Sequence, residues 1–475
     1  MKKAEVVFIP FPVPSHLIST LEFAKLLINH DNRLHITVLL MKQPHSTETD
    51  AYTKSLLTSD SINFINLPEF TVLPNTDPRA VFGALEAQKP NVRQAVSGIT
   101  NGEQHGHLAA FVVDMLCTTM IDIAKEFSVP MLVFFTSGIA SLGLNLHLHT
   151  LRVRDNVDPT QLQQVTELAI PTFANPVPSY SFPSSVLSKE WEQIFMNYVR
   201  GLKNSDGIIV NSFEELESHA VQSFSSHSEL AGLPTIYPVG PILTPEPETK
   251  GIVESDDIIK WLDNQPTSSV VFLCFGTRGS FDDDQVKEIA HAIENSGARF
   301  VWSLRKPHPR GVMVAPSEYT LSDLSLVLLE GFLDRTTGIG RVIGWAPQTQ
   351  ILSHPATGGF VSHCGWNSTL ESIYFGVPIA TWPLFAEQQT NAFQLVCELK
   401  IAVEIALDYR VELHQGPNYL LTADKIEKGI RSVLDNDEVR KNAKEMSEKS
   451  RKTLLENQSS YRYIGRLTHY IMNQI

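Results

Sequence analysis

The sequence lacks features that would point to several common classes of partner. Lysine and arginine number 38 against 52 aspartates and glutamates, a net charge of −14, so there is no cationic excess to bind nucleic acid or anionic lipid. No apolar run approaches the roughly 18 residues that a membrane span needs. We therefore expect a soluble, cytoplasmic protein that binds neither nucleic acid nor membrane.

Cysteines are few and scattered. The four, Cys117, Cys274, Cys364 and Cys397, show no C-x-x-C spacing, which favours buried free thiols over metal ligands or disulfides. The sequence also has no tight cluster of His, Asp and Glu with metal-ligand spacing. The residues therefore predict no metal centre.

What the chain does have is length and a repeated pattern. At 475 residues it is too long for one ordinary core, so two or more domains are expected. Short runs rich in Val, Ile and Phe alternate with segments of helical period, the pattern of parallel sheets with crossover helices. The alternation stops near residue 241 and restarts near 258. This predicts an α/β fold of two doubly wound, Rossmann-like domains that face each other across a cleft.

Three irregular stretches interrupt the alternation. The polar stretch 244–255 suits a linker, so the predicted units are a domain at 1–243, a second domain at 256–455 and a helix at 456–475 that packs back on the first domain. The proline-containing stretch 153–190 either shapes a binding site or is mobile, and the sequence favours neither. Residues 306–330 read as another poorly periodic loop.

The stretch 345–388 holds the densest set of candidate binding residues. Within it, a predicted strand is followed by SHCGWNS and then by a helix. Free N–H groups at a helix start attract an anion, and Gly365 allows close approach to the backbone. His363, Asn367 and Ser368 add side-chain donors suited to a diphosphate. The alternative is that Asn367 or Ser368 merely caps the helix.

Other residues of this stretch suit the remaining parts of a nucleotide sugar. Glu371, four residues after Asn367 on one helix face, can accept from both hydroxyls of a ribose, although a solvated helix charge is the alternative. Trp345 can stack on a nucleobase or be an ordinary core residue. Glu387 and Gln388, predicted in a loop, can bind the hydroxyls of a sugar.

A candidate general base lies in the first half of the chain. Transfer of a sugar to a hydroxyl needs a base and stabilisation of the leaving group. His16 follows the first predicted strand, where ligands bind in such sheets, unless it is only a cap or surface residue. Asp114 ends another strand of the same domain and can bind the other imidazole nitrogen, unless it only caps a turn.

The stretch 345–388 resembles the signature box of the plant family 1 glycosyltransferases, which use UDP-sugars. The residues that match the family's spacing are Trp345, Gln348, His363, Gly365 to Ser368, Glu371, Glu387 and Gln388. Other segments, such as VVFIPFP, IIVNSFEELE and YPVGPIL, extend the likeness over nearly the whole chain. The resemblance is closest to members acting on flavonoids and other phenolics, and it implies the GT-B fold.

The resemblance also implies a role for each matching residue. The implied donor contacts are Trp345, Ser303 and Gln348 at the uridine, Glu371 at the ribose, Thr277, His363, Asn367 and Ser368 at the diphosphate, and Thr136, Trp366, Glu387 and Gln388 at the sugar. The implied catalytic pair is His16 and Asp114. A Gln at position 388 goes with glucose in this family.

The implied reaction is a single displacement. His16 would deprotonate a hydroxyl of a small phenolic acceptor, and UDP would leave from the opposite face to give a β-glucoside. The co-substrate would be UDP-glucose, with no metal or other cofactor, and the protein would be a monomer. The chain departs from the family at Val13-Pro14-Ser15, where glycines are common, and at Arg278, which either touches phosphate or is solvated.

Other functions compatible with the sequence are a UDP-sugar-binding protein with little turnover, and a transferase that uses another UDP-sugar or a terpenoid acceptor. A binder would have no need of His16 and Asp114, so their presence favours an enzyme. An epimerase or hydrolase would need a water or another acid-base group where the acceptor sits. The stretch 153–190 favours an acceptor pocket instead.

Overall fold

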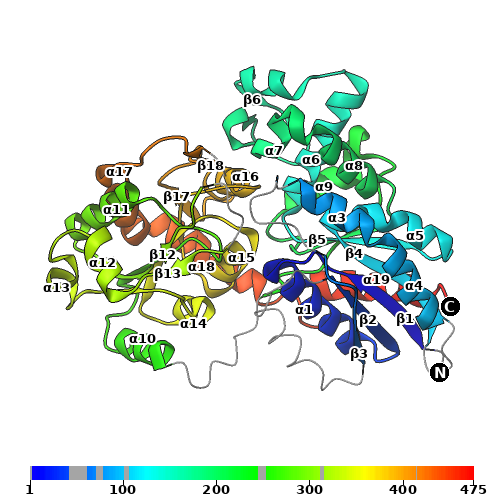
Figure 1. The fold of residues 1–475 in the computed structure, drawn as a ribbon, viewed down its shortest axis with the longest axis horizontal. Helices are drawn as coiled ribbons and strands as arrows, with labels where there is room; N and C mark the ends of the chain where they lie inside the picture. The colour runs from blue at the N-terminus through cyan, green and yellow to red at the C-terminus, as the bar shows by residue number, and fades with distance from the viewer. Residues whose placement is uncertain are drawn as a thin grey trace.

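Two parallel sheets organise the chain, each in its own lobe (Figure 1). The structure is a computed structural model that describes residues 3–41, 61–70, 77, 79–100, 106–243, 253–310, 315–412 and 415–475. This architecture confirms the predicted pair of Rossmann-like domains.

The first sheet has seven parallel strands among the described residues, in the order β3-β2-β1-β4-β5-β8-β9. Its central strands are apolar and buried, as expected when helices cover both faces. The strands are β1 (Ala4–Ile9), β2 (Leu34–Leu40), β3 (Ile62–Asn66), β4 (His107–Asp114), β5 (Met131–Phe135), β8 (Gly207–Val210) and β9 (Ile236–Pro238). The α-helices of this domain are α1 (Pro14–His30), α3 (Ala80–Ala87), α4 (Lys89–Thr100), α5 (Ile121–Glu126), α6 (Ile139–Arg154), α7 (Ser184–Leu187), α8 (Glu192–Lys203) and α9 (Ser218–Ser226).

The second sheet has six parallel strands in the order β14-β11-β10-β15-β16-β17, counted over the described residues. They are β10 (Val270–Cys274), β11 (Arg299–Ser303), β14 (Gly340–Ile343), β15 (Thr357–Ser362), β16 (Ile379–Thr381) and β17 (Ala402–Glu404). The helices are α10 (Val253–Asp263), α11 (Asp283–Ser296), α12 (Leu321–Val327), α13 (Phe332–Thr336), α14 (Gln348–Ser353), α15 (Trp366–Phe375), α16 (Gln388–Phe393), the π-helix η6 (Gln394–Glu398), α17 (Ala423–Asp435) and α18 (Asp437–Ser450).

The strand orders place two ligand-binding edges. In the first sheet the order reverses between β1 and β4, and in the second between β10 and β15. Ligands of doubly wound sheets bind at the carboxyl ends of strands at such reversals. His16 follows β1, and Asp114 is the last residue of β4. Thr277 follows β10, and His363 follows β15.

The last helix returns to the first domain. In α19 (Ser459–Met472), Ile464, Leu467 and Ile471 belong to the same buried cluster as Val6 and Phe8 of β1, and the helix contacts α1, β4 and β9. The red helix lies beside the blue and cyan strands in Figure 1. Residues 244–252 of the predicted linker lie outside the described residues. The rest of that stretch is helical, because α10 begins at Val253.

The other two stretches predicted to be irregular, 153–190 and 306–330, contain short elements. Residues 153–190 hold the 3₁₀ helices η2 (Pro159–Gln164), η3 (Ser179–Ser181) and η4 (Lys189–Trp191), the strand pair β6 (Glu167–Leu168) and β7 (Val177–Pro178), and α7; the remaining 3₁₀ helices of the first domain are η1 (Met115–Met120) and η5 (Ser228–Leu230). The expectation of a plain loop at 306–330 is wrong, because this region contains α12 and the antiparallel pair β12 (Arg305–Lys306) and β13 (Ser317–Glu318). A similar pair, β18 (Val411–Glu412) and β19 (Gly416–Pro417), precedes α17.

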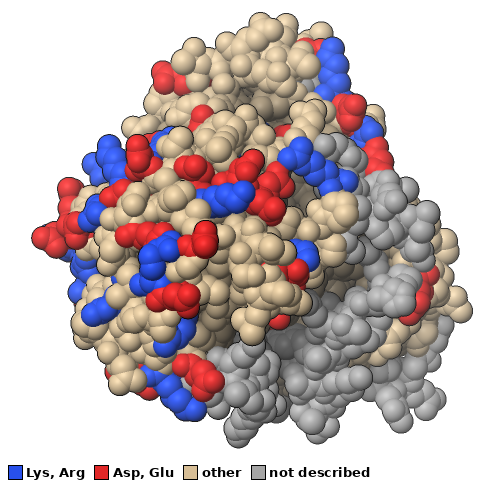
Figure 2. All heavy atoms as spheres, turned by 60° about the vertical axis from the view of Figure 1, so that its left-hand side comes forward, with Lys and Arg blue, Asp and Glu red and all other residues tan. Residues whose placement is uncertain are grey.

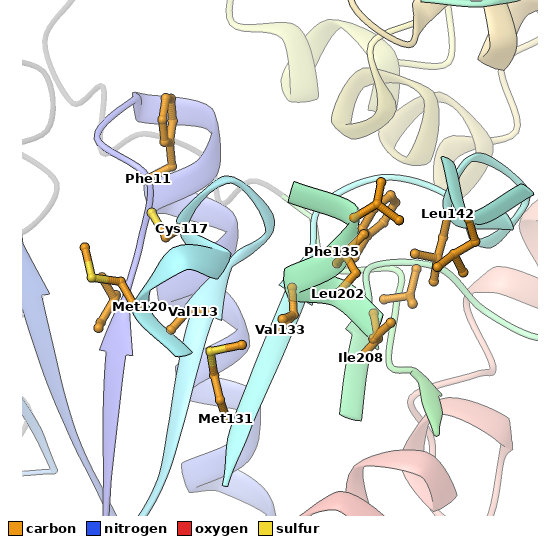
Figure 3. Packing of buried hydrophobic residues seen from close by; sticks show 14 of the residues in the cluster. Phe11, Val113, Cys117, Met120, Met131, Val133, Phe135, Leu142, Leu202 and Ile208 are labelled. Atoms are coloured by element: carbon orange, nitrogen blue, oxygen red, sulfur yellow. The ribbon is translucent and has the colours of Figure 1, made fainter. Parts of the chain in front are cut away.

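A large apolar core supports the first ligand-binding edge. Val113 of β4 and Val133 of β5 are fully buried beside Leu142 of α6 and Leu202 of α8 (Figure 3). Phe11, in the turn after β1, belongs to the same cluster. The core therefore holds the strand ends that carry the candidate base.

The surface charges and the helices agree with the absence of a cationic excess and of a long apolar run in the sequence. On the face shown in Figure 2, basic and acidic side chains are interspersed over the second domain. None of the described helices is long and apolar enough to cross a membrane.

Candidate active site

His16 and Asp114 form a hydrogen-bonded pair at the edge of the first sheet. His16 Nδ1 lies 2.7 Å from Asp114 Oδ2. The other carboxylate oxygen accepts from the Leu116 N–H at 2.8 Å. Asp114 therefore orients the imidazole and also caps a 3₁₀ helix, while His16 lies inside the first turn of α1, whose N-cap is Val13. The proposal that His16 is only a cap is wrong.

The electrostatic surroundings of His16 favour a basic imidazole. Burial lowers its pKa, but the charge of Asp114 and its hydrogen bond outweigh burial, so the pKa of His16 lies above its ordinary value. The charges of Glu387 and Arg278, both from the second domain, also act on its pKa, in opposite directions. Thr136 Oγ1 lies 3.4 Å from Nδ1. The imidazole therefore stands where residues of both domains meet.

His363 occupies a tight slot at the edge of the second sheet. A Cβ added at Gly276 or at Gly365 would come within 2.5 Å of His363 Nε2, so only glycine fits on either side of the ring. The side chain is buried, and burial lowers its pKa to about 4. Its Nδ1 has no hydrogen-bond partner among the described residues. His363 is therefore a neutral imidazole near neutral pH.

The start of α15 is not capped by a side chain. Its N-cap is Gly365, with no side-chain cap bond, so the alternative that Asn367 or Ser368 is a cap is wrong. Gln348 Nε2 donates to Ser368 Oγ at 2.9 Å and to Glu371 Oε2 at 2.7 Å. Glu371 is only 3% exposed, which excludes a solvated helix charge.

Trp345 is accessible. Its side chain is 47% exposed, so the alternative of a core tryptophan is wrong. The backbone N–H of Trp345 donates to Glu318 Oε1 at 3.0 Å, and the Arg305 guanidinium lies 5.5 Å from the ring centroid of Trp345. Ser303 Oγ donates to the Gly344 carbonyl at 2.7 Å, close to this tryptophan in the chain. An exposed ring beside a cation is free to stack on a planar ligand.

Two residues predicted to touch the donor direct their side chains to the other domain. The Trp366 indole is 3% exposed and donates to the Asn211 carbonyl at 2.6 Å. A contact of Trp366 with a sugar would therefore use its backbone N–H. Asn367 Nδ2 lies 3.1 Å from Ser19 Oγ of α1.

The remaining predicted donor contacts occupy two turns. Thr277 and Arg278 are both exposed in the turn after β10. Glu387 lies in the turn that precedes α16 and is its N-cap, whereas Gln388, predicted in a loop, is the first residue of that helix. Gln388 Oε1 accepts from the N–H groups of Leu384 and Phe385 at 2.9 and 3.0 Å, which fixes the orientation of its amide.

Tyr198 is a residue that the sequence patterns did not single out. Its hydroxyl is buried without a partner among the described residues. Burial raises its pKa well above the ordinary value, and the charges of Asp114 and Glu387 raise it further. The helical period of 192–203, which buries Phe195 and Val199, was the available signal.

The thiols and the acidic groups give no sign of another centre. Cys117, Cys274 and Cys364 are buried free thiols as predicted, and Cys397 is half-buried. Burial raises the pKa of Cys274 to about 11. Within the described part of the chain, no group of three or more His, Cys, Asp or Glu could hold a metal ion.

Comparisons with known proteins show which family the chain resembles over its whole length. A family model described as UDP-glucoronosyl and UDP-glucosyl transferase matches residues 254–452. UDP-glucose flavonoid 3-O-glucosyltransferase 6 of Fragaria ananassa is 49% identical over 487 aligned positions, covering 99% of each chain. The structure of a transferase from Siraitia grosvenorii in complex with UDP has a TM-score of 0.89 at 44% identity, covering 99% of this chain and 100% of that chain. Medicago truncatula UGT71G1 complexed with UDP-glucose has a TM-score of 0.86 at 38% identity, covering 99% and 98%.

Proposed function

The chain belongs to the plant family 1 UDP-glycosyltransferases, enzymes of the GT-B fold, and from this premise we propose that it transfers glucose from UDP-glucose to a hydroxyl of a small phenolic acceptor. The product is a β-O-glucoside. All residues assigned to the reaction lie in one chain, so the proposal needs no second subunit.

The observation that carries the proposal is the His16–Asp114 pair, 2.7 Å apart, within the electrostatic reach of Glu387. A carboxylate on Nδ1 holds the imidazole in the tautomer whose Nε2 can accept a proton, and it stabilises the imidazolium that forms. A protein that only binds UDP-sugars has no need of such a pair. The pair therefore supports transfer over binding.

The proposed reaction is one in-line displacement. His16 Nε2 takes the acceptor proton while the acceptor oxygen forms a bond to the anomeric carbon, and the bond from that carbon to the UDP oxygen breaks. Attack from the face opposite UDP inverts the configuration. The N–H groups at the start of α15 and the buried His363 face the developing negative charge on UDP. The proposed reaction is independent of metal ions.

The proposed donor is UDP-glucose, with Gln388 reading the sugar. Its amide is held by two backbone N–H groups, so its orientation relative to the sugar is defined. We expect Gln388→His to shift the ratio of kcat/KM for UDP-glucose and UDP-galactose away from glucose. An unchanged ratio would show that Gln388 does not discriminate between sugars.

The proposed acceptor class rests on the Fragaria ananassa relative, whose name places it on flavonoids. The direct test incubates the chain with UDP-glucose and a panel of flavonoids, stilbenes, phenylpropanoids and terpenoid alcohols, with and without EDTA. We expect β-glucosides of phenols, unaffected by EDTA. Release of UDP without a glucoside would indicate a hydrolase, and UDP binding without turnover would indicate a binding protein.

A further inference from the structure

Hydrogen bonds between the two domains occur at several places. Some lie along the stretch that precedes α7: Thr390 Oγ1 donates to the Ser181 carbonyl at 2.6 Å, and Arg410 Nη2 donates to the Phe182 carbonyl at 2.8 Å. Another lies within one helical turn of His16. Because His16 belongs to one domain and the donor residues to the other, this last contact bears on the geometry of the reaction.

The contact near His16 joins Asn367 of α15 to the first turn of α1. Asn367 Nδ2 lies 3.1 Å from Ser19 Oγ and 3.4 Å from the Ser15 carbonyl. Ser19 Oγ itself donates to the Ser15 carbonyl at 3.0 Å. A hydroxyl has one donor and two acceptor positions, so Ser19 can make both bonds at once. Ser19 is only 4% exposed, and Asn367 is half-buried.

The orientation of the Asn367 amide shows that this side chain serves the interface. Its N–H₂ group is directed to α1, while its Oδ1 is buried without a partner among the described residues. An amide oxygen cannot donate to a phosphate. At the start of α15, the Asn367 backbone N–H is the group that can face an anion.

Ser19 lies on the same face of α1 as His16, because residues three apart on a helix are neighbours. Asn367 is the second residue of α15, at whose start the diphosphate is expected. The Asp114 bond orients the imidazole inside the first domain but cannot set its distance from a donor held by the second. In-line attack requires reacting atoms held at about 3 to 3.5 Å, so that distance matters for the rate.

We propose that Ser19 is a positioning residue: through its hydrogen bond to Asn367 it holds the His16 face of α1 in register with the start of α15. The proposal rests on the proposed function. It predicts that loss of the Ser19 hydroxyl lowers kcat while UDP still binds, since the groups assigned to UDP lie in the second domain.

The test compares Ser19→Ala with Thr20→Ala. Thr20 is a matched control, because it is also buried and its hydroxyl also donates to the carbonyl four residues earlier. The Thr20 hydroxyl donates to the His16 carbonyl at 2.8 Å, and the Ser19 hydroxyl donates to the Ser15 carbonyl at 3.0 Å. We expect Ser19→Ala to lower kcat about tenfold, with UDP affinity by calorimetry within about twofold of wild type. Both substitutions should lower the melting temperature by a similar amount, but Thr20→Ala should change kcat little.

A double-mutant cycle with Asn367→Ala separates positioning from a structural role. In the Asn367→Ala background, Ser19→Ala should produce no further loss of kcat, and the acid limb of the pH profile should stay where it is in wild type. Independent losses that multiply, equal losses in Ser19→Ala and Thr20→Ala, or a displaced acid limb would overturn the proposal. Wild-type chain that fails to transfer glucose at all would instead overturn the proposed function.

Discussion

The two histidines at the edges of the two sheets have opposite surroundings. His16 has a carboxylate 2.7 Å away and a side chain that is one-fifth exposed, and its pKa is raised. His363 is wedged between two glycines, and burial lowers its pKa to about 4. A basic imidazole therefore lies at the edge of the first sheet and a neutral imidazole at the edge of the second. Environment, not residue type, separates their roles.

The largest expected effect tests the first half of this comparison. His16→Ala removes the proposed base and should lower kcat by about 10³-fold or more. UDP affinity, measured by calorimetry, should stay close to that of wild type, because the groups assigned to UDP lie in the other domain. Full activity of this variant on phenols would refute the assignment of His16 as base.

Asp114→Asn tests whether the carboxylate makes His16 different from His363. The asparagine can still accept from the Leu116 N–H, so the 3₁₀ helix keeps its cap. Loss of the charge, and of the tautomer that it holds, should lower kcat by about 10²-fold. Circular dichroism and melting temperature provide the control for folding. A wild-type kcat in this well-folded variant would contradict the proposed role of Asp114 in holding and charging His16.

His363→Asn tests the second half of the comparison. The buried imidazole is proposed to contact the diphosphate, so its loss should raise the Kd for UDP about tenfold, the value of one hydrogen bond to a charged group. The acid limb of the pH profile should not move. A loss of kcat as large as that of His16→Ala would show that the two histidines do not divide the work as described.

The pH dependence of kcat/KM provides the mildest test. His16 must be neutral to accept a proton, so activity should fall as the pH drops through its pKa, which is raised above the ordinary 6.5. The midpoint of the acid limb should therefore lie above pH 6.5. In Asp114→Asn that midpoint should move to lower pH, because the carboxylate is the group that raises the pKa. An acid limb that does not move would show that it does not report the titration of His16.

The sequence located the site well where the signal was local. The strand-end rule brought His16 and Asp114 together although they lie 98 residues apart, and helical spacing placed Glu371 near the start of α15. It missed β12, β13 and α12, so it did not foresee Glu318 and Arg305 beside Trp345. These elements are short: β12 and β13 have two residues each and pair only with each other among the described strands. Hydrophobic periodicity gives no signal over so few residues.

The sequence by itself determined the alternation of strands and helices, the family and the residue types available at each sheet edge. These follow from hydrophobic periodicity and from short-range motifs, which depend on neighbours in the chain. Only the tertiary structure decided how the groups are used: the Trp366 indole bonds to Asn211, the Asn367 amide reaches Ser19, and His363 is desolvated between two glycines. Hydrogen-bond partners and burial are set by residues far apart in the sequence. They in turn set the direction in which a side chain points and the charge that it carries.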